Sequence, residues 1–204
     1  GSREYVKLML ANGNVRVLTG HPVSRIRRSE NSVVVHADNG FEETFDHVVI
    51  ASHADSTLAM LEGASADERR LLGAFRYSRN RAVLHRDPSL MPKDRWLWSS
   101  WNYLSQAGAA TDTCNITYWM NALQPLNTKT DLFVTLNPAH EPAPGTIERD
   151  MIYDHPIYNP ETGRAQAELW TLQGKRRTWF CGAYFGAGFH EDGLQAGLAV
   201  AEQL

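Results

Sequence analysis

The chain has 204 residues, of which 43% are hydrophobic and 21% are charged, and its formal net charge is −3. This length corresponds to one domain or two small ones and is sufficient to bury a sizeable core. Six Trp, seven Tyr and seven Phe argue against a disordered chain. The small negative charge gives no electrostatic reason to expect nucleic acid or an anionic membrane as a partner.

The cysteine and histidine patterns exclude several site classes. Cys114 and Cys181 lie in different contexts, with no zinc spacing and no disulfide framework, so we expect a reducing compartment, the cytoplasm. The eight histidines show no metal-ligand spacing, and we expect no metal. No apolar run has the length of a transmembrane segment, and no signal peptide opens the chain. Gly1-Ser2 has the form of a cleaved affinity tag, so we expect a piece of a longer protein.

The first region, residues 3–62, has the pattern of an α/β segment. Residues 5–11 have the spacing of a helix. Short strand patterns follow at 15–18, 22–27, 32–36 and 41–45. Asn39-Gly40 predicts a tight turn between the last two strands. The continuous apolar run over 48–52 favours a strand buried on both faces. Ser52 and Asp55 are candidates to cap the helix that follows.

The middle region, residues 63–164, has a different pattern. Ser65 and Glu68 form a capping-box sequence that predicts a helix over 65–72. Aromatic-rich strand patterns follow it, at 82–85, 96–101, 115–119 and 132–136. Strands in succession without intervening helices predict an antiparallel sheet.

The last region, residues 165–204, returns to the α/β pattern. We expect a helix over 165–172, a strand over 176–181, a glycine-rich turn, and a helix from about Asp192 to the end. Backbone N–H groups and the positive end of a helix can face an anion or an electron-rich ring in such a turn. The alternative is a tight turn with close helix–sheet packing. Gly186-Ala187-Gly188 begins like G-x-G-x-x-G, but Glu191 occupies the third glycine position, so this is not a dinucleotide fingerprint.

Two stretches carry a family resemblance. A segment of the flavin-containing amine oxidoreductases is resembled by Val15-x-Val17, Val23-x-x-Ile26, Val33-x-Val35, Asn39-Gly40 and Phe45-Asp46-His47-Val48-Val49-Ile50-Ala51. The run from Gly188 to Gly197 is similar to the family's last FAD contact, G-[YF]-x-E-G-A-x-x-[AS]-G. Asp192 and Gly193 replace the usual Gly-Ala. Ala183 replaces the acid expected after Gly182, which leaves one contact to the pyrophosphate or ribityl chain without its usual side chain.

The resemblance implies FAD as the cofactor and an α/β (mixed α+β) fold. Residues 3–62 and 165–204 would be portions of a Rossmann-like FAD-binding domain, and 63–164 an antiparallel-sheet portion of the substrate domain. The cofactor-binding residues it implies are Val23, Ala51, Gly182, Ala183, Tyr184, Gly188, Phe189, His190, Glu191, Asp192 and Leu194. It implies no catalytic side chain that can be assigned here. The family's first βαβ unit with G-x-G-x-x-G is absent, so we expect this chain alone to bind FAD weakly or not at all.

The function implied is hydride transfer from a small-molecule or lipid substrate to flavin. More narrowly, the chain resembles a bacterial branch of predicted FAD/NAD-binding oxidoreductases associated with fatty-acid cyclopropanation or methylation enzymes. The first alternative is a desaturase or isomerase acting on an acyl lipid or isoprenoid. The second is a non-enzymatic binding module with a merely structural glycine turn. A nicotinamide enzyme is a third, without its fingerprint here. We also expect an exposed sheet edge that allows self-association.

Two further groups of residues favour structural roles. Aromatic residues at strand-like alternations are more typical of sheet packing than of a substrate pocket: Trp96, Trp98, Trp101, Tyr118 and Trp119. The basic run Lys175-Arg176-Arg177 is more typical of a solvated turn than of a nucleic-acid contact.

Overall fold

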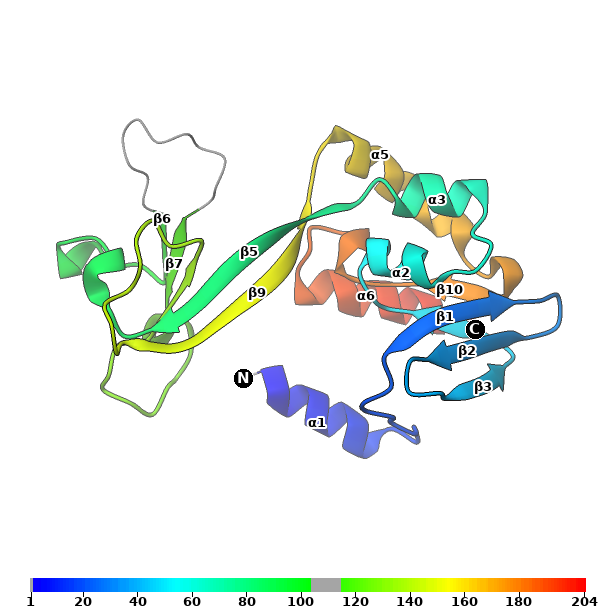
Figure 1. Cartoon of the computed structure of the whole chain (residues 1–204), viewed down its shortest axis with the longest axis horizontal. Helices are drawn as coiled ribbons and strands as arrows, with labels where there is room; N and C mark the ends of the chain where they lie inside the picture. The colour runs from blue at the N-terminus through cyan, green and yellow to red at the C-terminus, as the bar shows by residue number, and fades with distance from the viewer. Residues whose placement is uncertain (1, 104–114) are drawn as a thin grey trace. The chain divides into compact units, whose positions relative to one another are not determined.

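The computed structural model describes residues 2–103 and 115–204, which form two compact units (Figure 1). The sheet unit contains residues 2–14 and the described part of 79–155. The layered unit contains residues 15–78 and 156–204. Strands β5 (Arg76–His85) and β9 (Ile147–Ile157) cross the boundary and connect the two.

The layered unit combines two small sheets with four helices. The first sheet is antiparallel, and its strands are β1 (Val23–Arg28), β2 (Val33–Ala37) and β3 (Glu42–Phe45). In the second sheet β4 (Val48–Ile50) pairs in parallel with β10 (Thr178–Phe180). The helices are α2 (Ala54–Met60), α3 (Ala66–Leu72), α5 (Pro160–Leu169) and α6 (His190–Ala201). Short 3₁₀ turns are η3 (Trp170–Leu172), η4 (Lys175–Arg177) and η5 (Ala183–Phe185).

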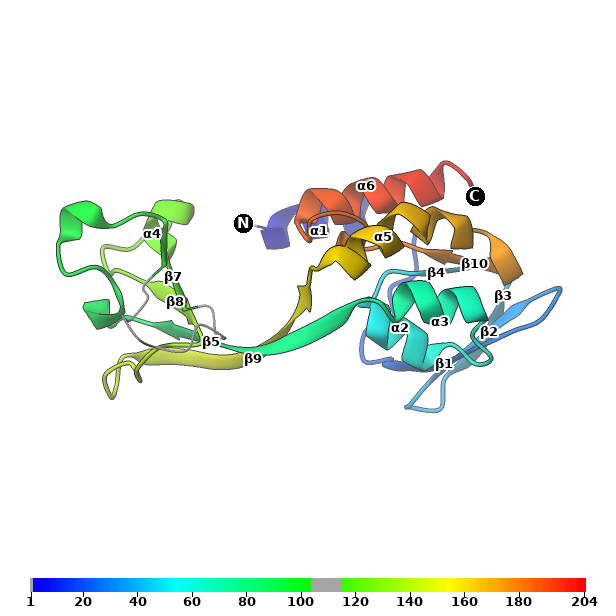
Figure 2. The same cartoon turned by 90° about the horizontal axis from the view of Figure 1, so that it is seen from above.

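The two faces of β10 determine how this unit is layered. Phe180, fully buried, points into the main core, which it shares with Ile50 and residues of α2, α3 and α5. Trp179 and Cys181 point the other way, against Ala196 and Val200 of α6. Figure 2 shows α6 on one side of the β4–β10 pair and α2 and α3 on the other. Since side chains alternate along a strand, these residues bury apolar surface on both faces of β10.

The sheet unit is built on antiparallel strands in the order β6-β7-β8-β5-β9. Its remaining elements are α1 (Ser2–Asn12), η1 (Pro88–Leu90), η2 (Arg95–Leu97), β6 (Trp101–Tyr103), β7 (Ile116–Trp119), α4 (Met120–Leu123) and β8 (Phe133–Leu136). No helix in the described parts of either unit has the length and apolar character needed to cross a membrane.

A buried polar row crosses four strands of this sheet. His85 Nε2 lies 2.7 Å from Thr135 Oγ1, which lies 2.9 Å from Thr117 Oγ1, and Asn102 donates to the carbonyl of Thr117. The N–H of Asp87 donates to His85 Nδ1, so the proton of the neutral ring is on Nε2 and is donated to Thr135. Each polar group in the row therefore has a partner inside the sheet.

Several elements are confirmed. The mixed fold class is confirmed, as are the helix over 5–11, the antiparallel sheet of the middle region and the final strand–turn–helix. Ser65 and Glu68 form the capping box at the start of α3. Gly40 has φ +86 in the turn between β2 and β3. The assignment of 3–62, 63–164 and 165–204 to FAD-binding and substrate domains stays a prediction.

Other sequence predictions are wrong. Residues 15–18 form no strand. In 96–101, only Trp101 belongs to a strand: residues 96 and 97 lie in a 3₁₀ turn, 98–100 are irregular, and Trp98 packs edge-on against Trp119 and Phe133. Neither Ser52 nor Asp55 caps α2; the hydroxyl of Tyr77 accepts from the Ala54 N–H instead, at 2.9 Å.

Strand β4 is buried on one face only. Ile50 is buried, but Val49 is 43% exposed, and β4 has no described partner on the edge away from β10. The helix predicted over 165–172 begins earlier, at Pro160, because Asn159 and Thr162 form a capping box there. The sequence patterns do not predict the long strand β9, since charged residues and a His interrupt its apolar residues and most of the strand is exposed.

A buried ion pair joins the antiparallel sheet to α3. Arg28 on β1 donates from both terminal nitrogens to the two carboxylate oxygens of Glu68, and the Ser65 N–H donates to the same carboxylate. Burial disfavours the charged carboxylate, but these hydrogen bonds outweigh it and hold the pKa of Glu68 below its ordinary value. Both side chains are almost completely buried.

We predict that Glu68→Gln destabilises the fold by about 3–5 kcal/mol, because it leaves the Arg28 charge buried without its partner. Denaturant unfolding measures this change. Glu168→Gln is the control, since it removes an exposed carboxylate paired with Arg70 and should change stability little. Equal losses in the two variants would contradict a central role for the buried pair.

We also predict that His85 makes the fold less stable in mild acid. Burial lowers the pKa of His85 from 6.5, so the unfolded chain takes up the proton first as the pH falls below that value. The contribution is at most about 1.4 kcal/mol per pH unit. Between pH 8 and 5, the free energy of unfolding should fall less steeply with pH in His85→Gln than in the unsubstituted chain. The same dependence on pH in both proteins would refute the role of His85.

Candidate functional site

The parallel pairing of β4 and β10 brings the two predicted FAD-contact stretches together. Phe180 lies opposite Ile50, and the N–H of Cys181 donates to the carbonyl of Ile50 at 3.1 Å. The chain segments that begin with Ala51 and Gly182 therefore leave the same edge. In α/β sheets, this edge, at the carboxyl ends of parallel strands, is where ligands bind.

Val23 and Ala51 line one cavity of about 330 Å³ beside β4. Its other walls are formed by Ile26, Val35, Val48, Val49, Ile50, Ser52 and Met60. A second cavity, of about 440 Å³, shares Val23, Val35, Val48 and Val49 with the first. We call the two together the β4-edge groove. Its shared walls are four valines, so it suits an apolar or aromatic group.

The glycine turn after β10 brings backbone close to side chains that leave no room for a Cβ. Gly182 has φ +147, and a Cβ there would lie 2.9 Å from the ring of Tyr184. A Cβ on Gly186 would lie 2.2 Å from Asp192 Oδ1. Gly188 has φ +95, and a Cβ there would lie 2.8 Å from the hydroxyl of Tyr158. Both the left-handed conformation and the close approaches require glycine.

Helix α6 begins directly after this turn. The N–H of Phe189 donates to Asp192 Oδ2 at 2.8 Å, which holds the carboxylate against the start of the helix. His190, Glu191 and Asp192 make up the first turn. The positive end of the helix dipole is therefore at the glycine turn, where it favours negative charge.

The predicted cofactor-binding residues differ in what they expose. Phe189 is 62% exposed and Leu194 47%, whereas Tyr184 is buried against Phe75. Burial also raises the pKa of Tyr184. Tyr184 can therefore offer only its backbone to a ligand. Ala183 is half-buried, and its carbonyl accepts from the N–H of Gly188 at 3.2 Å.

Sequence reasoning missed the side chains that hold this site. Gln166 on α5 donates from Nε2 to the carbonyls of Tyr184 at 3.0 Å and Gly186 at 2.7 Å, so it fastens the glycine turn. Tyr77 binds the start of α2 and stacks on His53; burial raises its pKa to about 12. No local pattern marks these residues, because each contact joins distant parts of the chain.

Comparisons with known proteins agree with the resemblance seen in the sequence. Residues 1–68 match the family described as flavin containing amine oxidoreductase. A comparison with curated proteins found no match.

The fold is similar to those of several solved structures. The CLA-producing fatty acid isomerase from P. acnes has a TM-score of 0.65 at 13% identity, covering 99% of this chain and 52% of that one. Putrescine oxidase bound to putrescine has a TM-score of 0.62 at 11% identity, and the match covers 98% of this chain and 52% of that one. Cyclohexylamine oxidase from Brevibacterium oxydans has a TM-score of 0.57 at 16% identity, and the match covers 99% of this chain and 52% of that one. This chain spans about half the length of these proteins, with which it shares a fold.

We predict opposite effects from alanine at two glycines near α6. Gly188→Ala should destabilise the fold by at least about 1–2 kcal/mol, because it forces a left-handed backbone on alanine and a Cβ onto Tyr158. Gly197→Ala should stabilise it by about 0.5–1 kcal/mol, because nothing lies within 4 Å and alanine favours the helix. Thermal unfolding compares the two, and a Gly188→Ala protein as stable as the unsubstituted chain would contradict the turn geometry.

Proposed function

We propose, from the premise that this chain belongs to the flavin-containing amine oxidoreductase superfamily, that it is the C-terminal part of an FAD-dependent oxidoreductase. The family and the fold are those of oxidoreductases. The observation that carries the proposal is the parallel register of β4 and β10, because it places Ala51 and Gly182 at one edge, beside the start of α6.

The described residues fit a flavin dinucleotide in two respects. The β4-edge groove has mainly apolar walls that include Val23 and Ala51, with Arg16, His21 and His47 in its larger cavity, and such walls are suited to a flat ring system with polar edges. The glycine turn exposes backbone without side chains and leads into a helix N-terminus, suited to an anionic or electron-rich group. Ala183 and Asp192 depart from the family pattern, so backbone groups would make most of the contacts in the turn.

The proposed holding residues act mainly through backbone and position. Val23 and Ala51 would contact the adenine end, and the turn from Gly182 to Tyr184 the middle of the cofactor. Gly188 and Phe189, together with His190 to Asp192 and Leu194 of α6, would face the flavin ring system. FAD, when bound, supplies the acceptor for a hydride taken from the substrate. The dipole of α6 favours the negative charge that arrives with the hydride.

A second candidate function is desaturation or isomerisation of an acyl lipid or isoprenoid by the same cofactor. It is supported by the likeness in fold to a fatty acid isomerase, which extends over 99% of this chain. Both candidates take a small-molecule or lipid substrate. The free edge of β4 supports self-association of the chain when nothing else pairs with it.

We predict that the longer protein containing this chain carries FAD. It should be purified, denatured, and the released material identified by its visible spectrum and chromatography. Released FAD would support the proposal, and turnover of amines against unsaturated acyl lipids would then separate the two candidates. A colourless protein that takes up no added FAD would overturn it.

For the 204-residue chain alone we expect weak FAD binding, because it spans about half the length of its structural neighbours. Fluorescence titration with FAD measures this affinity. A dissociation constant below about 1 μM, which corresponds to roughly −8 kcal/mol, would show that these residues suffice without a further domain.

A further inference from the structure

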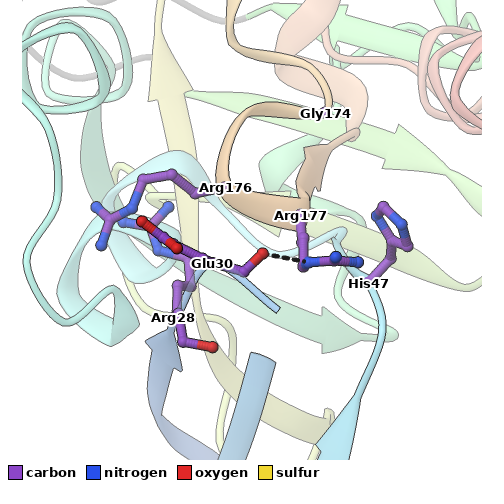
Figure 3. Close-up of a pocket in the computed structure, with 7 residues that line it drawn as sticks. Arg28, Glu30, His47, Gly174, Arg176 and Arg177 are labelled. Atoms are coloured by element: carbon purple, nitrogen blue, oxygen red, sulfur yellow. Dashed lines mark hydrogen bonds between the residues drawn. The ribbon is translucent and has the colours of Figure 1, made fainter. Parts of the chain in front are cut away.

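A cavity of about 680 Å³ lies at the amino ends of β4 and β10, opposite Ala51 and Gly182, and shares His47 with the larger cavity of the β4-edge groove (Figure 3). His47 directly precedes β4 and Arg177 directly precedes β10, so both belong to the amino ends of the parallel strands. The cavity is lined by Arg28, Ser29, Glu30, His47, Gly174, Arg176 and Arg177. All of these residues belong to the layered unit.

The backbone at this cavity is unusual. Arg176 has φ 53 and ψ 37, and Arg177 has φ 60, so two consecutive non-glycine residues are left-handed. Residues with a Cβ rarely adopt this conformation, and strained backbone of this kind concentrates at functional sites. Here it places two adjacent arginines on the wall of one cavity, as Figure 3 shows.

Hydrogen bonds to backbone carbonyls orient both guanidinium groups. Arg176 Nη1 donates to the carbonyl of Gly63 at 2.7 Å. Arg177 donates from Nε to the carbonyl of Glu30 at 2.8 Å and from Nη1 to that of Asp46 at 3.3 Å. Neither guanidinium forms an ion pair within the part of the chain that the structure describes. Each keeps N–H groups beyond those used in these bonds.

The charge balance of the cavity favours an anion. Arg28 is matched by its buried partner Glu68, while the carboxylate of Glu30 opposes Arg176 and Arg177. One positive charge remains in excess. The Trp179 Nε1–H donates to His47 Nδ1 at 3.2 Å, so the neutral ring of His47 carries its proton on Nε2, as a further donor.

We propose that this cavity binds the phosphate group of a small molecule. Arg177 and His47 come from separate segments, and in Figure 3 the side chain of Arg177 extends toward His47, so a tetrahedral oxyanion can accept hydrogen bonds from both, while Arg176 extends in the opposite direction and adds positive charge to the cavity wall. Guanidinium groups bind phosphate with good geometry and remain charged at any physiological pH. The cavity volume exceeds that of phosphate itself, so an organic phosphate should bind more tightly than the free ion.

The test is a titration of the chain followed by amide NMR, with inorganic phosphate and glucose 6-phosphate as separate probes and ionic strength held constant with chloride. We expect saturable shifts at 28–30, 47 and 174–177. Arg176→Asn removes one guanidinium, and asparagine tolerates the left-handed backbone, so binding should weaken at least tenfold. Lys175→Gln, next to Arg176 but outside the cavity lining, should bind as the unsubstituted chain does.

Glu30→Gln is a second variant, which leaves Arg176 and Arg177 and their left-handed backbone unsubstituted. It removes the opposing carboxylate and should tighten binding several-fold. Binding of glucose 6-phosphate that is no tighter than that of inorganic phosphate would contradict the assignment to an organic phosphate. The absence of saturable shifts, or equal losses in Arg176→Asn and Lys175→Gln, would overturn the proposal. FAD content plays no part in these measurements, so this outcome is separate from that of the proposed function.

Discussion

The parallel pairing of β4 with β10 is the constraint on which the layered unit depends. Three residue pairs, ending at Phe180 and Ile50, join segments from opposite ends of the sequence. Because the two strands are parallel, Ala51 and Gly182 follow them at the carboxyl edge, and His47 and Arg177 precede them at the amino edge. It also sends Phe180 into the main core and Trp179 against α6.

Around this pairing, a small number of polar contacts hold the other parts in register. The buried Arg28–Glu68 pair ties the antiparallel sheet to α3, and the Ser65 N–H completes the carboxylate's hydrogen bonds. Gln166 holds the glycine turn through two carbonyls, and Arg177 holds two loops in the same manner. In each case a side chain satisfies groups that would otherwise lack partners on folding, so loops keep a defined shape.

The two edges of the parallel pair differ in chemistry. At the carboxyl edge, glycine and a helix start present backbone N–H groups, while the neighbouring groove is apolar. At the amino edge, arginine side chains surround a cavity. The first arrangement accords with the resemblance to the flavin-containing amine oxidoreductases, and the second shares only His47 with the residues on which that resemblance rests. Since β4 has one described neighbour and the chain spans half of related structures, its free edge is suited to a further strand.

Features whose determinants lie within a few residues could be predicted from the sequence. The capping box of Ser65 and Glu68, the Asn39-Gly40 turn and the strand–turn–helix around Gly182 are of this kind, and the last two also belong to the stretches that carried the family resemblance. For the site, the sequence indicated which residues contact FAD, and this assignment stays a prediction. Only the tertiary structure decided that Val49 is exposed, that Tyr77 binds the start of α2, that Gln166 holds the turn and that Arg176 and Arg177 share a cavity. Their partners lie far away in the chain, and no local periodicity records such a contact.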